Sequence, residues 1–329
     1  MRILVTGAGG FIAARLASQL AQSGKKVRAM VRTRESALLR HPNIEIVKGD
    51  ILDKESLDKA TRNVSQVYHV AALANNWAPS EKIFFDINVT GTENVIEAAR
   101  KNGAGRIVMT STAGTIGPSV NGQPVHEGLL PPAFLYSGYE RSKFAAEELI
   151  RKRSKEGYDI VIVNPTRVFG PGPLSKSNSV TNIVYKYTRG RWRFQPGSGQ
   201  EIGNYAYVDD VIRGHFLAME KGRSGERYIL GGENVSYNQL IKKIAEVHGK
   251  EYGLISIPLG AFAAYGALSD FLGDYFGIEP MITKSWLQKY KANWTASTEK
   301  AEKELGYTVT PMKEAIARTI HWLSEQYPS

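Results

Sequence analysis

Short apolar runs alternate with stretches of helical periodicity over the first half of the chain. The runs are rich in β-branched residues, as buried parallel strands are, and they lie at residues 2–6, 27–31, 44–47, 67–70, 107–109 and 160–163. Between the first two runs, Ile12, Leu16 and Leu20 recur at helical spacing, and Gly24 stands where a left-handed residue would end the helix. The pattern predicts alternating strands and helices.

Such an alternation is typical of an α/β fold with a doubly wound parallel sheet, the Rossmann type. Right-handed crossovers between successive parallel strands place helices on both faces of the sheet. Ligands of these folds bind in a crevice at the carboxyl ends of the strands. The residues that follow the six predicted strands are Gly7, Arg32, Asp50, Ala71, Ser111 with Thr112, and Pro165 with Thr166. We therefore expect these residues to surround one crevice.

A change of composition marks a second part of the chain. Glycine, proline and serine crowd residues 170–179. We expect the Rossmann domain to span residues 1–168 and to be re-entered at about residues 205–230. Residues 169–329 should then form mainly a smaller C-terminal substrate-binding lobe.

The first strand runs through Gly7 and Gly10 into a helix that begins near Phe11 and Ile12. In such a turn, glycines let the backbone approach a dinucleotide pyrophosphate, which also meets the free N–H groups and the positive dipole end of the helix. Ile12 occupies the place of the third glycine in Gly-x-Gly-x-x-Gly, so the motif is judged on its position after the first strand. A structural turn in another α/β protein is the alternative.

Tyr139 and Lys143 stand four residues apart in a segment of helical character. This spacing places both side chains on one helix face, and a nearby ammonium is expected to lower the pKa of the phenol. Such a phenol can exchange a proton with a carbonyl or alcohol oxygen near neutral pH. The pair is weak evidence alone, because Tyr-x-x-x-Lys also arises by chance on exposed helices.

The composition excludes several other chemistries. The chain has no cysteine, which excludes disulfides and thiolate nucleophiles, and its six histidines show no metal-ligand spacing, so we expect no metal. The net charge of +10 raises the question of nucleic acid. However, the basic clusters at residues 151–153 and 189–193 are most simply a solvated helix face and part of the substrate lobe. We expect no nucleic-acid partner.

The sequence predicts a cytoplasmic protein without an integral membrane segment. The first strand begins at the second residue, which leaves no room for a signal peptide. The most apolar late stretch, residues 254–276, contains Pro258, Asp270 and Asp274 and is poorly suited to crossing a bilayer. We expect a lid helix there, with peripheral contact at a membrane surface as the alternative.

Taken together, these motifs resemble the extended short-chain dehydrogenase/reductases of the NAD-dependent epimerase/dehydratase superfamily. The matching stretches are residues 6–12, 49–51, 69–72, 88–92, 110–113, 139–143, 164–172 and 207–210, in the family's order. The chain looks nearest to the branch of dihydroflavonol 4-reductase and 3β-hydroxysteroid dehydrogenase. Residues 300–307 and the Val31-Arg32 strand ending resemble that branch in particular.

The resemblance implies a catalytic site of Thr112, Tyr139 and Lys143. Tyr139 would be the general acid/base, and Lys143 would depress its pKa while holding the nicotinamide ribose. Thr112 stands at the place of the family's usual serine, whose hydroxyl binds the substrate oxygen, and Ser111 next to it is the alternative for this role. Neighbouring strand residues point to opposite faces, so only one of the two hydroxyls should reach the pocket.

The resemblance also implies a nicotinamide dinucleotide. Arg32 and Arg34 stand where an NAD-preferring enzyme carries an acidic residue, and guanidinium groups bind the 2′-phosphate of NADP, so we expect NADP(H), with NAD as the alternative. Asp50 and Ile51 would flank the adenine. The remaining cofactor-binding positions are Gly7, Gly10, Phe11, Ile12, Ala71, Ala72, Leu73, Thr110, Tyr139, Lys143, Pro165, Thr166 and Val168. The side chain of His69 is expected to pack rather than to bind a ligand.

We therefore expect an NADP-dependent oxidoreductase that reduces a ketone or aldehyde, or oxidises a secondary alcohol, on a bulky, largely apolar small molecule. Nine aromatic residues are expected near the pocket, namely Trp77, Phe84, Phe85, Phe134, Tyr136, Phe169, Trp192, Phe194 and Tyr205. One alternative is a nucleotide-sugar epimerase or dehydratase with retained NAD, although Gly203 replaces the arginine that such relatives use to hold a diphosphate. The other is a non-catalytic NADP-sensing protein. Members of the family often form dimers through helices that flank the sheet, so the resemblance implies a homodimer.

Overall fold

The computed structural model describes residues 2–33, 35–75, 77–130, 132, 135–174, 178–262, 264, 266 and 288–328. In this part of the chain, seven parallel strands form the central sheet, in the order β10-β6-β5-β4-β1-β2-β3. Their bounds are β1 (Arg2–Thr6), β2 (Lys26–Val31), β3 (Ile44–Lys48), β4 (Val64–His69), β5 (Arg106–Thr110), β6 (Ile160–Pro165) and β10 (Arg227–Leu230). The predicted doubly wound sheet is confirmed.

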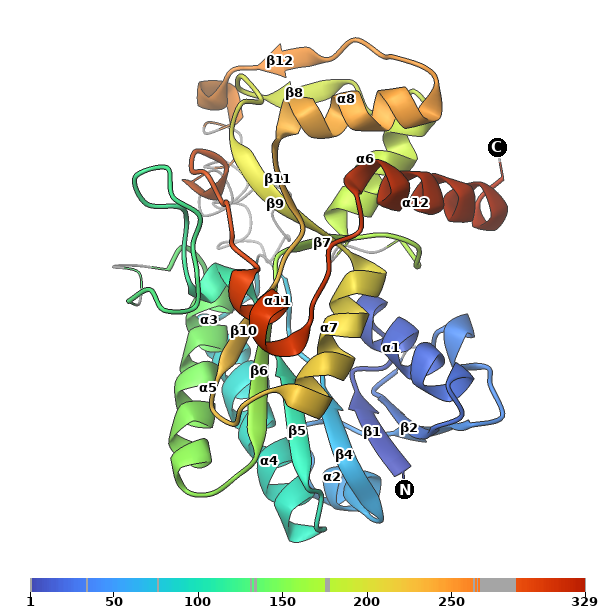
Figure 1. Cartoon of the computed structure of the whole chain (residues 1–329), viewed down its shortest axis with the longest axis vertical. Helices are drawn as coiled ribbons and strands as arrows, with labels where there is room; N and C mark the ends of the chain where they lie inside the picture. Colours follow the sequence, from blue (N-terminus) through green and yellow to red (C-terminus); the bar gives the residue numbers. More distant parts are fainter. Residues whose placement is uncertain are drawn as a thin grey trace.

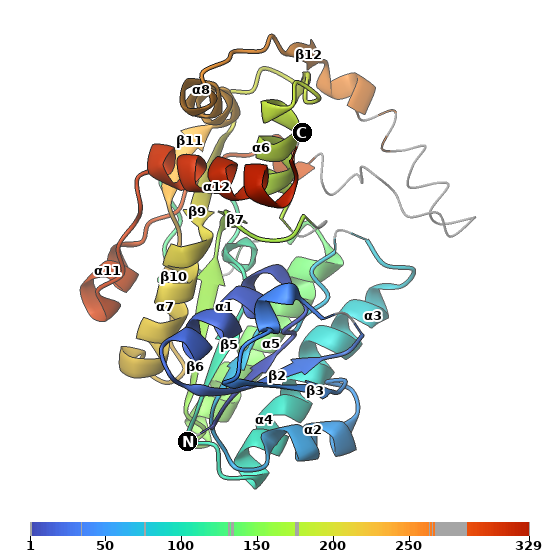
Figure 2. The ribbon, with the colours of Figure 1, turned by 90° about the vertical axis from the view of Figure 1, so that its right-hand side faces the viewer.

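Helices cover both faces of this sheet because successive strand residues point to opposite sides. Ile3 and Val5 pack into one core with helices α1 (Phe11–Gln22) and α7 (Val208–Lys221). Leu4 packs into a second core on the other face. The helices on that face are α2 (Lys54–Thr61), α4 (Gly91–Lys101) and α5 (Gly138–Lys155). Figure 2 shows the sheet between α1 and α4.

Shorter helical turns complete the connections between these elements. They are η1 (Ala37–Leu39), α3 (Glu81–Phe85), the π-helical η2 (Asp86–Thr90) and η3 (Ala113–Thr115). The edge strand β3 is less buried than expected, with Ile46 36% exposed, because β2 is its sole neighbour in the sheet as described. The other five predicted runs form the inner strands.

A second lobe lies beyond the carboxyl ends of the strands (Figure 1). Its small sheet has the order β11-β9-β7, with β7 (Arg167–Phe169) parallel to β9 (Ile202–Tyr207) and β11 (Glu233–Ser236) antiparallel to it. The helices and strands around this sheet are α6 (Ser179–Thr188), α8 (Tyr237–His248), α12 (Met312–Gln326), β8 (Phe194–Pro196) and β12 (Ile255–Ile257). Within the predicted re-entry, α7 packs on the central sheet and β10 is one of its strands, whereas β9 belongs to this lobe. The residue limits of the two domains stay a prediction.

Two aspartates at the start of α7 hold this helix to neighbouring elements. The Asp209 carboxylate accepts hydrogen bonds from Arg15 Nε at 2.5 Å and from Gln19 at 2.7 Å, both on α1. Asp210 accepts from the backbone N–H and the hydroxyl of Thr310, each at 2.7 Å. The chain near Thr310 connects α11 (Glu299–Leu305), which packs on α7, with α12 of the second lobe.

The lid helix expected within residues 254–276 lies mostly outside the described residues. Among the residues that are described, no helix is both long and apolar enough to cross a bilayer.

Candidate functional site

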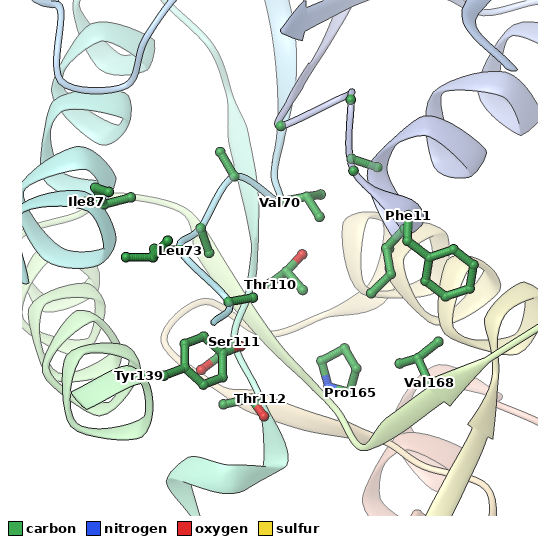
Figure 3. A pocket seen from close by; sticks show the side chains of 18 of the residues that line it. Phe11, Val70, Leu73, Ile87, Thr110, Ser111, Thr112, Tyr139, Pro165 and Val168 are labelled. Carbon is green, nitrogen blue, oxygen red and sulfur yellow. The ribbon is translucent and has the colours of Figure 1, made fainter. Parts of the chain in front are cut away.

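A cavity of about 480 Å³ opens at the carboxyl ends of the central strands (Figure 3). Its wall includes sixteen of the eighteen residues predicted for the site: Gly7, Gly10, Phe11, Ile12, Arg32, Asp50, Ile51, Ala71, Ala72, Leu73, Thr110, Thr112, Tyr139, Pro165, Thr166 and Val168. Of the other two, Lys143 is buried away from the wall, and Arg34 lies outside the described residues. The residues predicted to follow the strands therefore lie around one cavity.

The glycine turn after β1 forms part of the wall of this cavity. Gly7 has a φ of +69°, and a Cβ there would lie 2.7 Å from Cα of Ala71, so only glycine lets the turn pass so close to the loop after β4. Gly10 is the N-cap of α1, and no side chain caps the helix. Free backbone N–H groups at this helix start suit the pyrophosphate of a dinucleotide.

The rim beside the glycine turn carries the residues that follow β2 and β3, the next strands in the sheet. Arg32 is exposed on the cavity wall, and no carboxylate of the described residues forms an ion pair with it. Asp50 is fixed by two hydrogen bonds, since its backbone N–H donates to Ser56 at 3.1 Å and its carboxylate accepts from Leu52 at 2.9 Å. The unpaired guanidinium of Arg32, beside the fixed turn at Asp50, can bind a phosphate at this rim.

The phenol of Tyr139 and the hydroxyl of Thr112 are hydrogen-bonded to each other. Tyr139 lies in the first turn of α5, which begins with a capping box in which Ser137 and Glu140 each accept a bond from the other's backbone N–H at 3.3 Å. Thr112 is the second residue after β5, and its hydroxyl also accepts from the N–H of Gly114 at 3.2 Å. Figure 3 shows both side chains on the same side of the cavity.

The protonation of this pair differs from the prediction. Burial, together with the charge of Glu140, raises the pKa of Tyr139 to about 12, although the hydrogen bond with Thr112 opposes this shift. The Nζ of Lys143 instead lies 3.9 Å from the sulfur of Met109. Burial lowers the pKa of Lys143 to about 8, against the charge of Glu147. The sequence spacing could not reveal that both groups lose water on folding, which disfavours phenolate and ammonium alike.

Ser111 and Thr112 both border the cavity, but their hydroxyls have different partners. Ser111 Oγ donates to Oε1 of Glu147 at 2.5 Å. Glu147 is completely buried and also accepts from Thr115 at 2.8 Å and from Asn164 at 2.7 Å. The hydroxyl of Ser111 is therefore bound to the buried carboxylate of Glu147, whereas that of Thr112 faces the phenol of Tyr139.

The same network holds Thr112 in place. Asn164 Nδ2 donates to the carbonyl oxygen of Thr112 at 2.9 Å as well as to Glu147. Arg151 and Arg227 approach the other oxygen of Glu147 at 3.1 and 3.5 Å. Sequence reasoning missed Glu147 and Asn164. The available signal was an acidic residue four positions after Lys143, on the buried face of the same helix.

Two polar side chains fix the loop after β4. His69 is buried between the hydroxyls of Thr6 at 2.8 Å and Thr92 at 3.0 Å, and burial together with the charge of Lys143 lowers its pKa to about 3. Asn88 accepts from the N–H of Leu73 at 2.8 Å and donates to Ser142 on α5 at 2.9 Å. His69 packs rather than facing the cavity, and Asn88 ties the cavity wall to the helix that bears Tyr139.

A second cavity, of about 160 Å³, adjoins the first, and Thr112, Thr166 and Arg167 border both. Its wall also contains an ion pair of 2.7 Å between Lys289 and Glu140. The rest of the wall is formed by Ala113, Gly114, Gly117, Val125, Asn204, Trp294 and Ala296. None of the expected aromatic residues that are described borders either cavity, and Phe134 lies outside the described residues. Trp294, which sequence reasoning missed, is the aromatic residue here.

Comparison with known proteins identifies the class to which this fold and site belong. Residues 3–231 match the NAD dependent epimerase/dehydratase family, and the chain belongs to this family, as predicted. Members of this family are NAD(P)-dependent oxidoreductases and epimerases.

Two curated relatives and one solved structure illustrate the similarity. Sterol demethylase protein B of Methylococcus capsulatus is 30% identical, and the alignment covers 99% of each chain. The 3beta-hydroxysteroid-dehydrogenase/decarboxylase isoform 1 of Arabidopsis thaliana is 27% identical over 86% of this chain and 67% of its own. The Thermus thermophilus UDP-glucose 4-epimerase, solved in complex with NAD, is 24% identical over 100% of both chains, with a TM-score of 0.79, and shares the fold.

Proposed function

We propose that this protein is an NADP(H)-dependent oxidoreductase that reduces a ketone or aldehyde, or oxidises a secondary alcohol, on a bulky, largely apolar small molecule. The observation that carries the proposal is the hydrogen-bonded pair of Tyr139 and Thr112. The pair borders the same cavity as the glycine turn at Gly7. A proton donor therefore shares one cavity with a turn suited to a dinucleotide.

In reduction, Tyr139 donates its proton to the carbonyl oxygen while Thr112 holds that oxygen by a second hydrogen bond. A pKa of about 12 keeps the phenol protonated at neutral pH, which is the state that a proton donor needs. The bound nicotinamide supplies the hydride. Lys143 holds the nicotinamide ribose in this proposal, and Ser111 serves the buried network instead of the substrate.

The cofactor fits the groups that line the larger cavity. The N–H groups at the start of α1 would bind the pyrophosphate, and Arg32 would bind the 2′-phosphate of NADP, with Arg34 expected to assist it. Asp50 and Ile51 would flank the adenine. The NAD in the related epimerase structure keeps NAD as the alternative cofactor.

The names of two relatives support the proposed substrate class. One is a sterol demethylase protein and the other a 3beta-hydroxysteroid dehydrogenase, and sterols are bulky and mostly apolar. The second cavity offers Trp294, Val125 and Ala296 as apolar wall beside the catalytic pair. A cytoplasmic location, a homodimer through α4 and α5, and peripheral membrane contact stay predictions.

The test is a panel of ketones, aldehydes and secondary alcohols with NADPH and NADH. Transfer of deuterium from labelled NADPH to the carbonyl carbon of a bulky ketone would support the reductase. The second candidate function is that of an epimerase. The observation in its favour is that an epimerase of the same fold binds NAD. Tightly retained NAD after purification, with conversion of a nucleotide sugar and no net oxidation, would replace the reductase by that function. Binding of NADPH without any turnover would favour the sensing protein.

A further inference from the structure

Arg167 is a half-buried cation at the junction of the two cavities. It begins β7, directly after Pro165 and Thr166, and it borders both the large cavity and the smaller one beside Thr112. A charged group there faces whatever molecule extends from the catalytic pair into the second cavity.

The guanidinium of Arg167 has one weak hydrogen bond and no counter-ion among the described residues. Its NH1 donates to the hydroxyl of Tyr205 at 3.3 Å, and its Cζ lies 5.6 Å from the centre of that ring. The other cation of the second cavity wall, Lys289, is paired with Glu140 at 2.7 Å, and the nearby Arg227 is paired with Glu147 at 3.5 Å. A guanidinium presents five donors, so most of those of Arg167 are left for a ligand.

Gly203 fixes the position of this guanidinium. Arg167 lies opposite Tyr205 in the parallel pairing of β7 with β9, and its side chain passes over Gly203 two residues away. A Cβ at Gly203 would lie 2.5 Å from NH1 and 3.0 Å from Cζ of Arg167. The glycine thus makes room for the cation between the small sheet and the cavities, and the Tyr205 ring supports it from the neighbouring position.

We propose that Arg167 binds a carboxylate of the substrate and so turns the reacting carbonyl or alcohol toward Tyr139 and Thr112. The proposal rests on the proposed function and refines its substrate class to an apolar molecule with one carboxylate. A half-buried guanidinium without a counter-ion is satisfied by two parallel charge-assisted bonds to a carboxylate.

The charge around the second cavity favours a single negative group. Arg167 is the cation of its wall that has no acidic partner among the described residues, because Lys289 is already balanced by Glu140. A diphosphate would bring at least two negative charges to this single unpaired guanidinium, which can balance only one of them. The apolar wall at Trp294 and Ala296 suits the hydrocarbon part of the molecule.

The test compares 3-(2-oxocyclohexyl)propanoate with its methyl ester, which has the same ketone but no charge. With NADPH, the wild-type protein should prefer the acid in kcat/KM, and Arg167→Leu should lower the acid-to-ester ratio about tenfold, mainly through KM of the acid. Gly203→Ala keeps the charge but displaces it and should lower the ratio less. No preference in the wild type, or an unchanged ratio in Arg167→Leu, would overturn the proposal.

A binding measurement separates this proposal from the proposed function. Cyclohexylpropanoate has no ketone to reduce, and calorimetry with NADP present should show that it binds the wild type about tenfold more tightly than Arg167→Leu, while cyclohexylpropanamide shows no such difference. If neither ketone is turned over but this binding is intact, the reductase is refuted and the carboxylate site stands. Arg167-dependent binding of UDP-glucose instead of cyclohexylpropanoate would overturn the carboxylate. Circular dichroism and thermal melting establish that each variant folds.

Discussion

The Tyr139 phenol and the Thr112 hydroxyl form a hydrogen bond between two separate elements, the first turn of α5 and the segment that follows β5. The two groups are brought together by long-range contacts, since Asn164 on β6 holds the carbonyl oxygen of Thr112 at 2.9 Å. A substrate oxygen that replaces this mutual bond would receive one donor from each element. This geometry makes the contribution of each residue separately testable.

Removal of the phenolic hydroxyl should abolish most of the turnover. Tyr139→Phe keeps the ring but removes the proton donor, and we expect kcat for ketone reduction to fall by about 10²–10⁴-fold while the dissociation constant of NADPH stays nearly constant. Stopped-flow turnover and fluorescence titration measure the two quantities. Tyr136→Phe, at a half-buried tyrosine outside both cavity walls, is the control. Turnover near the wild-type level in Tyr139→Phe would rule out the assigned role.

Reversal of the charge at Arg32 should change the preferred cofactor. A carboxylate at this rim repels the 2′-phosphate of NADP and can bind the ribose hydroxyls of NAD, so the ratio of kcat/KM for NADPH over NADH should fall about 100-fold in Arg32→Glu. Arg40→Glu alters an exposed arginine that borders neither cavity and should leave the ratio as it is. If both variants behave alike, Arg32 does not read the phosphate.

The buried carboxylate of Glu147 should matter for both stability and rate. Glu147→Gln keeps the shape but turns one acceptor into a donor that faces the donors of its present partners, and we expect a loss of about 3 kcal/mol in the free energy of unfolding. Because Asn164 then loses its anchor, Thr112 should shift and kcat should fall more than KM rises. Denaturant unfolding and steady-state kinetics measure these effects. Glu148→Gln, at the exposed neighbour, should show neither.

A feature of this protein could be predicted from the sequence where it depends on local contacts, and could not where it depends on long-range contacts. The strands and the cavity wall could be predicted because each depends on a short apolar run and the residue directly after it, as at β1 with Gly7 or β2 with Arg32. The contact of Arg167 with Gly203 could not be predicted, because it depends on the pairing of β7 with β9. The raised pKa of Tyr139 was also hidden, since burial depends on the whole fold.

The buried ammonium of Lys143 should make stability depend on pH in a defined direction. Its pKa falls from 10.5 in the unfolded chain to about 8 in the folded protein, so between these values the unfolded chain binds more protons and stability rises with pH. Below pH 8, the folded protein carries the full cost of the buried charge. Lys143→Met removes that charge beside Met109, and we expect it to raise the melting temperature at pH 7 by a few degrees. The gain should shrink toward pH 10.5, where the wild-type amine is already neutral. Lys152→Met, on the exposed face of the same helix, should show no such trend. A gain that is equal at pH 7 and pH 10 would mean that packing, and not charge, decides the effect.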